Sequence, residues 1–209
     1  MRVDKVILRA ALSTLAAIAA LLAAMILALC FIFPSTMMRI TYDMGMDGAS
    51  IRYAKRAYDY TKDVYFIAFA TEVAIGLHDY AQIETCGEEL IAADEKFDAY
   101  CAQKNASIES EDVFGGYEQY VFGQVCVAKY LQGEKTEAIE KAFALVDSGF
   151  PTNNAVAAVL LTALSQEDSS SVNAVKEKMN EMDTGAFSVA DKEYFDALLA
   201  LANGETING

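Results

Sequence analysis

The stretch AALSTLAAIAALLAAMILALCFIF, Ala10 to Phe33, decides how the rest of the chain is read. Its 24 residues carry no charge, and only Ser13 and Thr14 interrupt the apolar and small side chains. A helix of this length is about 36 Å long at roughly 1.5 Å per residue, whereas the hydrocarbon core of a bilayer is about 30 Å thick. The stretch therefore predicts a transmembrane helix that ends at Pro34.

A cleaved signal peptide and a lipoprotein signal are the alternatives to a permanent anchor. A signal peptide has a shorter apolar core, about 7–15 residues, followed by a small-residue cleavage site. The string Leu27-Ala28-Leu29-Cys30 is similar to a lipobox, but Leu29 stands where a small residue is expected and apolar residues continue past Cys30. We therefore expect residues 1–33 to form an uncleaved signal-anchor.

The basic residues that flank the apolar run predict its orientation. Arg2, Lys5 and Arg9 precede the run, whereas Arg39 is the only cation in the first fifteen residues after it. Because Lys and Arg concentrate on the cytoplasmic side, we expect a single-pass protein with a cytoplasmic N-terminus and an extracytoplasmic domain. The basic residues between 52 and 62 would also suit a cytoplasmic domain, so the opposite placement stays open.

Residues 34–62 are predicted to form a juxtamembrane helical segment with a basic face. The candidates for contact with the membrane surface are Arg39, Arg52, Lys55 and Arg56. Cations beside a bilayer are attracted to anionic headgroups. The alternative is a helix face that is simply solvated.

The composition indicates an acidic, all-α protein. The 209 residues carry a net charge of −14 and include only two prolines. Such a charge repels nucleic acid backbones, so no nucleic-acid partner is expected. Abundant Ala, Leu, Glu and Lys favour helices, and no pair of strands is needed.

Periodic apolar residues predict a series of helices beyond the juxtamembrane segment. The predicted ranges are 64–77, 81–93 with an extension towards 105, 116–131, 135–148, 153–165, 171–182 and 188–202. Ser188 followed by Asp191 is typical of a helix N-cap, and Asn203-Gly204 is typical of a helix end. Residues 63–209 are therefore expected to form one helical domain.

These helices repeat at a nearly constant spacing. The turns at Gly133 and Asp168 are 35 residues apart, and the expected helix starts near Gln119, Asn153 and Phe187 are 34 apart. The best unit runs from Gln119 to Thr152. Within it, Phe122, Val125, Cys126, Gly133, Ala138 and Pro151 fall on signature positions, and Ala142 and Leu145 depart from them.

This pattern resembles the tetratricopeptide repeat, best over residues 119–202. The resemblance implies an α-solenoid of antiparallel helix hairpins that binds a protein partner in a groove. Carried over position by position, the groove residues would be Tyr65, Glu72, Tyr120, Val127 and Tyr130. An irregular helical bundle is the alternative architecture.

The search for chemistry predicts no catalytic, cofactor-binding or metal-binding residue. His78 is the single histidine, no phosphate-binding or nucleophile motif is present, and Glu84, Glu88 and Glu89 read as a solvated helix face. The three cysteines after the anchor, Cys86, Cys101 and Cys126, read as buried thiols, with a Cys86–Cys101 disulfide as the alternative.

The function expected from these features is a membrane-tethered protein–protein interaction module, an adaptor or scaffold of envelope or secretion type. Residues 10–33 would provide the membrane contact, and the protein partner is unidentified. One alternative is a structural subunit whose anchor packs through Ala16, Ala20 and Ala24 in a larger membrane complex. Another is an enzyme whose site the sequence does not reveal.

Overall fold

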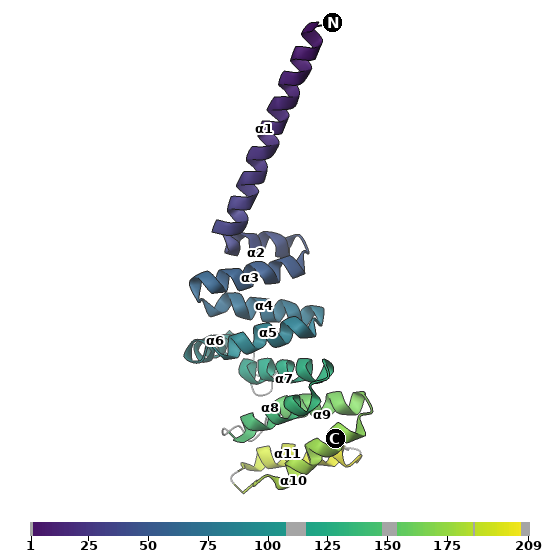
Figure 1. Ribbon diagram of the computed structural model, residues 1–209. Helices are drawn as coiled ribbons and strands as arrows, with labels where there is room; N and C mark the ends of the chain where they lie inside the picture. The colour runs from purple at the N-terminus through teal and green to yellow at the C-terminus, as the bar shows by residue number, and fades with distance from the viewer. Residues whose placement is uncertain (1, 108–115, 148–153, 186, 206–209) are drawn as a thin grey trace. The chain divides into compact units, whose positions relative to one another are not determined.

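Eleven helices make up the described part of the chain, and no strand occurs in it (Figure 1). The computed structural model describes residues 2–107, 116–147, 154–185 and 187–205. This confirms the predicted all-α class. The helices are α1 (Arg2–Ile32), α2 (Pro34–Asp43), α3 (Asp47–Thr61), α4 (Val64–Leu77), α5 (Tyr80–Ile91), α6 (Glu95–Ser107), α7 (Gly116–Leu131), α8 (Lys135–Asp147), α9 (Asn154–Ser165), α10 (Ser169–Glu181) and α11 (Val189–Ala202).

The chain divides into two units, Met1–Ala70 and Thr71–Gly209. In unit 1, α2 and α3 pack against each other. Met38 of α2 and Ile51, Ala54 and Ala57 of α3 are buried. Pro34 occupies the first turn of α2, where its missing N–H costs nothing, and Ser35 makes no capping hydrogen bond.

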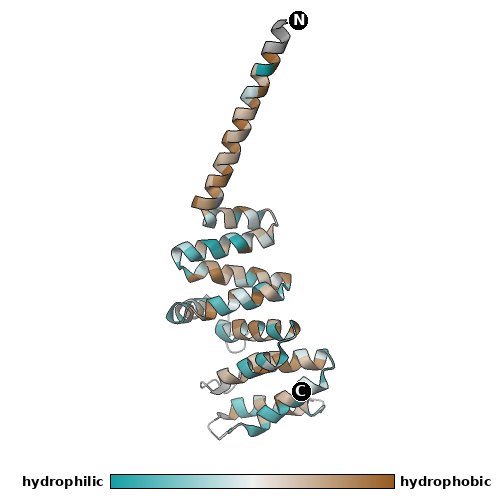
Figure 2. Ribbon diagram, viewed as in Figure 1, coloured by the Kyte–Doolittle hydropathy of each residue, from teal (hydrophilic) through white to brown (hydrophobic). Residues whose placement is uncertain are grey.

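Helix α1 is the apolar element of unit 1. Its segment Ile7–Leu29 is long and apolar enough to cross a membrane, and none of it is buried within the molecule. Figure 2 shows α1 as hydrophobic along most of its length, whereas the other helices mix hydrophobic and hydrophilic residues.

In unit 2, α7 is the central helix. It contacts α5, α6, α8 and α9, while α10 contacts α8, α9 and α11. The core around α7 to α11 includes Tyr130, Ala138, Leu160, Val175 and Met179, all nearly or fully buried. Small residues allow the helices to approach closely, and Gly87 of α5 lies directly against Val125 of α7.

Most helix ends in unit 2 agree with the sequence prediction. α7 has the predicted bounds, Ser188 accepts a hydrogen bond from the Asp191 N–H at 3.2 Å, and Gly204 has a left-handed φ of +77°. The extension of the 81–93 helix is wrong, because the chain ends α5 and begins α6 around Asp94, whose φ is +47°. Pro151, expected near the end of the best repeat unit, lies outside the described residues.

Candidate functional site

Two of the predicted groove residues, Glu72 and Tyr120, lie in one cluster of unit 2. The hydroxyl of Tyr117 donates to Glu72 at 2.8 Å, and Lys104 forms an ion pair with Glu72 at 2.9 Å. The ring of Tyr120 lies 6.3 Å from that of Tyr117. Glu72 comes from α4, Lys104 from α6, and both tyrosines from α7. We call these four residues and Tyr100, which packs edge-on against Tyr117, the tyrosine cluster.

Burial and the Glu72 charge set the protonation of the tyrosine cluster. Burial raises the pKa of Tyr117 far above its usual range, and the Glu72 carboxylate raises it further. Burial and Glu72 also raise the pKa of Tyr120. Both phenols therefore stay protonated at neutral pH, as donors rather than bases or nucleophiles. Tyr120 remains 37% exposed, so the cluster offers one accessible aromatic face.

The other predicted groove residues lie elsewhere. Tyr65 is exposed in unit 1 and packs edge-on against Phe66. Val127 is half-buried on α7. Tyr130 is only 1% exposed and donates its hydroxyl to Asp168 at 2.7 Å, so it presents no side-chain surface to a partner.

A second site, absent from the prediction, surrounds Lys129 of α7. This lysine is 4% exposed, although it carries a charge. Its Nζ lies 2.7 Å from Glu84, 2.9 Å from Glu137, 3.2 Å from Glu134 and 3.3 Å from Glu88. We call these four glutamates the carboxylate cluster. They come from α5, from the turn after α7 and from α8, so one ammonium group joins three helices.

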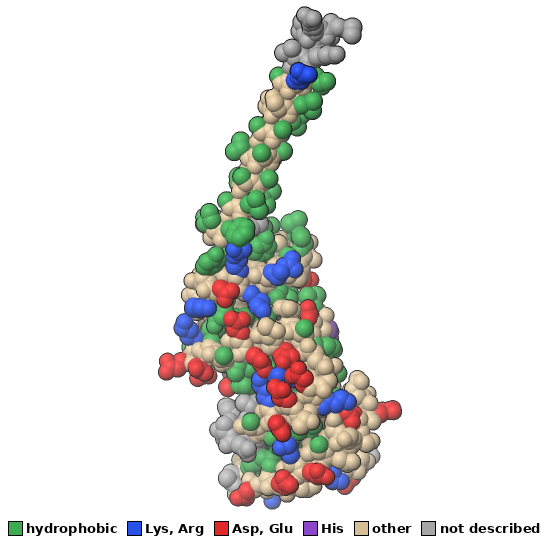
Figure 3. Space-filling model, in the orientation of Figure 1, with side chains coloured by type: hydrophobic (Ala, Val, Ile, Leu, Met, Phe, Trp, Pro, Cys, Tyr) green, Lys and Arg blue, Asp and Glu red, His purple; other side chains and the backbone are tan. Residues whose placement is uncertain are grey.

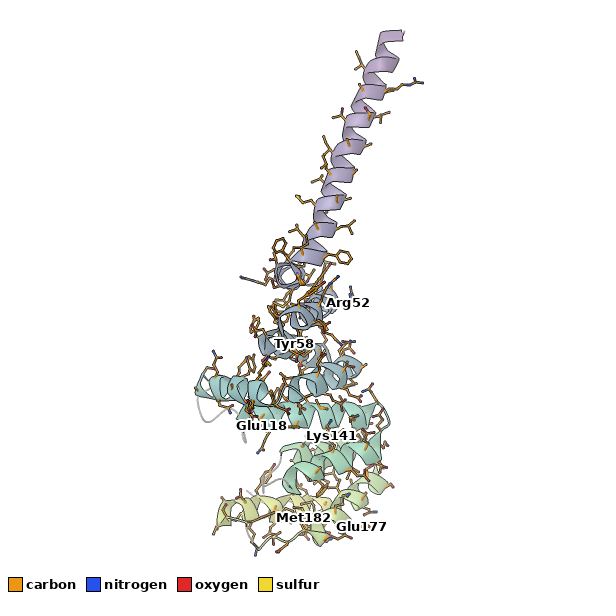
Figure 4. The ribbon with its side chains drawn as sticks, turned by 60° about the vertical axis from the view of Figure 1, so that its left-hand side comes forward. Arg52, Tyr58, Glu118, Lys141, Glu177 and Met182 are labelled. Carbon is orange, nitrogen blue, oxygen red and sulfur yellow. The ribbon has the colours of Figure 1, made fainter. Side chains whose placement is uncertain are left out.

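The electrostatics of this site favour the charged lysine. Burial alone would lower the pKa of Lys129, but hydrogen bonds to three carboxylates and the charge of Glu88 raise it well above its usual range. Burial also acts to raise the pKa of Glu88, yet Lys141, which bonds it at 2.7 Å, and Lys129 together lower it. Figure 3 shows acidic side chains gathered around basic ones on this face of unit 2, and Figure 4 labels Lys141 on α8.

One sequence signal could have revealed this site. Lys129 interrupts the stretch Val125 to Leu131, which is otherwise apolar or aromatic. A charge in the buried stripe of a helix requires nearby counter-charges. The sequence predicts a solvated helix face for Glu84 and Glu88 and so misses these counter-charges. Their partner, Lys129, lies about 45 residues further along the chain.

The cysteines are three separate buried thiols, so the alternative of a Cys86–Cys101 disulfide is wrong. Burial raises the pKa of Cys101 and of Cys126 to about 12. His78 is exposed in the turn after α4, with a left-handed φ of +54°. Among the residues that the structure describes, no group of His, Cys, Asp or Glu side chains is placed to hold a metal ion.

The predicted membrane-surface residues all belong to unit 1. Arg39 and Arg52 are exposed, and Lys55 and Arg56 are half-buried. The Arg56 guanidinium lies 4.2 Å from the centre of the Phe31 ring. Residues 1–70 carry eight Lys or Arg and five Asp or Glu, whereas residues 71–209 carry eight and 25, with no arginine. The basic side chains thus accompany the apolar helix, and the acidic ones belong to unit 2.

Comparisons with protein-family models, curated proteins and solved structures each find no match to this chain.

Proposed function

We propose that this protein is a membrane-tethered interaction module: α1 anchors it in a bilayer, and unit 2 binds a protein partner. The observation that carries the proposal is the exposed face of Tyr120 beside a Glu72 carboxylate that Tyr117 and Lys104 hold in place. Tyrosine is one of the residue types enriched in protein-binding hot spots.

The same proposal includes a solenoid of helix hairpins similar to the tetratricopeptide repeat. In its support, α7 packs against α8 and α9 packs against α10, as two successive hairpins would, and α7 also packs against α9 and α5. The second helices α8 and α10 begin at Lys135 and Ser169, 34 residues apart. The first helices α5, α7 and α9 begin 36 and 38 residues apart, so the spacing is longer than the family period there.

The partner we propose is a protein segment rich in Lys and Arg. Unit 2 carries 25 carboxylates against eight lysines. Such a charge attracts basic segments and accelerates their association at low salt. We place unit 2 outside the cytoplasm, with the N-terminus inside, in line with the positive-inside rule.

A photo-crosslinking residue at position 120 tests the proposal in native membranes. The same probe at position 189, on exposed Val189 of α11, is the matched control. We expect position 120 to yield a discrete cross-linked protein, and the yield to fall at high salt and on addition of a polylysine competitor. Equal products from the two positions, or a yield that salt does not change, would contradict the proposed site.

A structural subunit is the alternative, and α1 supports it. Ala16, Ala20 and Ala24 are spaced four residues apart and lie on one face of the segment Ile7–Leu29, none of which is buried by the residues that the structure describes. Small residues at this spacing allow two membrane helices to approach closely. If the protein is a structural subunit of this kind, replacing all three alanines by Leu should abolish self-association of the span in a bilayer. If the protein is the interaction module proposed above, the replacement should not change the association state of the span.

A further inference from the structure

A pocket of about 520 Å³ in unit 1 lies between the end of the apolar helix and the basic face of α3. Ile26 of α1 contributes one wall, Met37 and Ile40 of α2 another, and Met44 and Met46 lie at the turn between α2 and α3. Its volume is in the range of small-molecule sites. Methionines adapt their shape to flexible apolar ligands.

The polar end of this pocket carries two arginines. Arg52 and Arg56 line it from α3, and none of its described lining residues is a carboxylate. The neighbouring pocket of about 620 Å³ differs, because it includes Asp43 together with Arg39. Figure 4 labels Arg52 on α3, close to the end of α1 within unit 1.

These arginines have no protein counter-charge in the part of the chain that the structure describes. The ion pair found in unit 1 joins Lys62 and Asp59 at 3.8 Å, and no described carboxylate pairs with Arg52 or Arg56. In unit 2, by contrast, Lys104, Lys129, Lys135 and Lys141 all bind carboxylates. Arg52 and Arg56 are one helical turn apart on α3, and the guanidinium of Arg56 also lies over the Phe31 ring at 4.2 Å. Guanidinium groups match the geometry of phosphate oxygens.

We propose that this pocket binds an anionic phospholipid of the surrounding membrane. The headgroup phosphate accepts hydrogen bonds from Arg52 and Arg56, and an acyl chain lies along Met44 and Ile26 towards the apolar helix. The apolar wall favours a lipid over inorganic phosphate, which would leave Met37, Ile40 and Ile26 in contact with water. The inference rests on the proposed placement of α1 in a bilayer.

The test uses the full-length protein in vesicles of phosphatidylcholine alone or of phosphatidylcholine with a minority of phosphatidylglycerol. Retained lipids are counted by native mass spectrometry after release from the vesicles. A hydrogen bond to a charged group contributes about 1.5 kcal/mol or more, roughly tenfold in binding, so we expect a preference for phosphatidylglycerol of about tenfold or more from the two arginines together. Arg52→Ala/Arg56→Ala should remove most of it, and Arg52→Lys/Arg56→Lys should keep part of it.

The matched comparison is Arg39→Ala/Lys55→Ala, which removes the same charge from the two candidate membrane-surface residues outside the pocket. It should weaken the diffuse attraction to anionic lipid and therefore lower the preference by clearly less than Arg52→Ala/Arg56→Ala does. Equal losses in the two alanine variants would replace the pocket with a diffuse basic surface and overturn the proposal. Displacement of the lipid by millimolar inorganic phosphate would also overturn it, in favour of a soluble anion.

Flotation with phosphatidylcholine vesicles separates this inference from the placement on which it rests. A protein that does not float after alkaline washing lacks the anchor, and both proposals fail. A protein that floats but shows no preference for phosphatidylglycerol keeps its anchor, and only the lipid site fails. Circular dichroism must show equal helix content in each variant, and the Lys variant replaces any Ala variant that does not fold.

Discussion

Lys129 connects three helices of unit 2 through one charged atom. Its ammonium group is surrounded by the carboxylate cluster, whose members range from 19% to 63% exposed in their side chains. Desolvating a charge is costly unless it is paired, so the lysine and the glutamates must fold as a set. Lys141 supports the same set from α8 with a single bond to Glu88.

Replacing Lys129 by Met should therefore destabilise unit 2. The four carboxylates would lose their shared counter-charge and repel one another, and we expect a loss of about 2–4 kcal/mol in the free energy of unfolding, below the upper end for buried pairs because Glu134 and Glu137 can be rehydrated. Urea unfolding followed by circular dichroism measures it. Lys141→Met is the control, with an expected loss of about 1 kcal/mol or less. Equal losses would contradict a special role for Lys129.

The hydrogen bonds of Asp168 predict how the stability of unit 2 changes at acid pH. It accepts hydrogen bonds from Lys135 at 2.6 Å, from Tyr130 at 2.7 Å and from the Ser171 hydroxyl at 2.8 Å, and its side chain caps α10. The Lys135 bond, followed by those of Tyr130 and Ser171, lowers the pKa of Asp168 far below its usual range.

Because the folded pKa of Asp168 lies below the unfolded value of about 3.9, its stabilisation is present above that pH and is lost as the pH falls through the folded pKa. Asn can still cap the helix but cannot carry the charge. We therefore expect Asp168→Asn to lower the urea midpoint at neutral pH, with a difference from the wild type that shrinks steadily below about pH 4. A difference independent of pH would contradict the charge-based explanation.

At the scale of elements, the contact between α5 and α7 depends on a glycine. A Cβ added at Gly87 would overlap the side chain of Val125, whereas one added at Gly76 of α4 would meet open space. Gly is otherwise unfavourable in a helix by about 1 kcal/mol relative to Ala. The two glycines therefore give opposite expectations for the same substitution.

We expect Gly87→Ala to destabilise the protein by about 1–3 kcal/mol through overpacking, despite the gain in helix propensity. Gly76→Ala should be neutral or stabilising by up to about 1 kcal/mol. A thermodynamic cycle of Gly87→Ala with Val125→Ala measures the contact, and the two losses should be less than additive because the smaller residue accommodates the new methyl group. Additive losses would place Gly87 away from Val125.

The sequence predicts where most helices begin and end, but it does not predict which side of each helix is buried. Gly133, Ser188 with Asp191, and Asn203-Gly204 mark helix ends through local backbone chemistry, so these ends could be predicted. The break at Asp94 carries no Gly or Pro, and only the surrounding packing selects it. The sequence pattern likewise predicts that Tyr130 faces a partner, whereas its hydroxyl donates to Asp168. The buried side of a helix depends on neighbours that are distant in sequence.

At the scale of the molecule, the two units differ in their charged side chains and in how these are paired. Unit 1 combines an apolar helix with arginines that, among the described residues, pair with no carboxylate. Unit 2 combines a large excess of carboxylates with eight lysines, at least four of which form ion pairs with them. In our proposal the first set is suited to a lipid surface and the second to a basic protein. In the same proposal, the tyrosine cluster of unit 2 adds an aromatic contact surface to the electrostatic attraction of the carboxylates.

A charged residue placed in the middle of α1 tests whether this helix spans a membrane. Leu21 is 71% exposed near the middle of the apolar segment, and an arginine at the centre of a membrane helix costs about 3 kcal/mol of insertion free energy. We expect Leu21→Arg to increase the fraction extracted from membranes at alkaline pH. Leu161→Arg, at an exposed leucine of α9, is the control and should leave extraction unchanged. Complete extraction of the wild type would contradict the anchor.

The confinement of arginine to unit 1 also determines how the chain can be cut. The last of its five arginines is Arg56, so an arginine-specific protease has no cleavage site in residues 57–209. Complete digestion would release residues 57–209, which comprise unit 2 and residues 57–70 of unit 1, as one acidic fragment with every lysine of unit 2 intact. Cleavage at Arg56 falls within α3, so it yields the proposed binding unit free of the anchor while dividing unit 1.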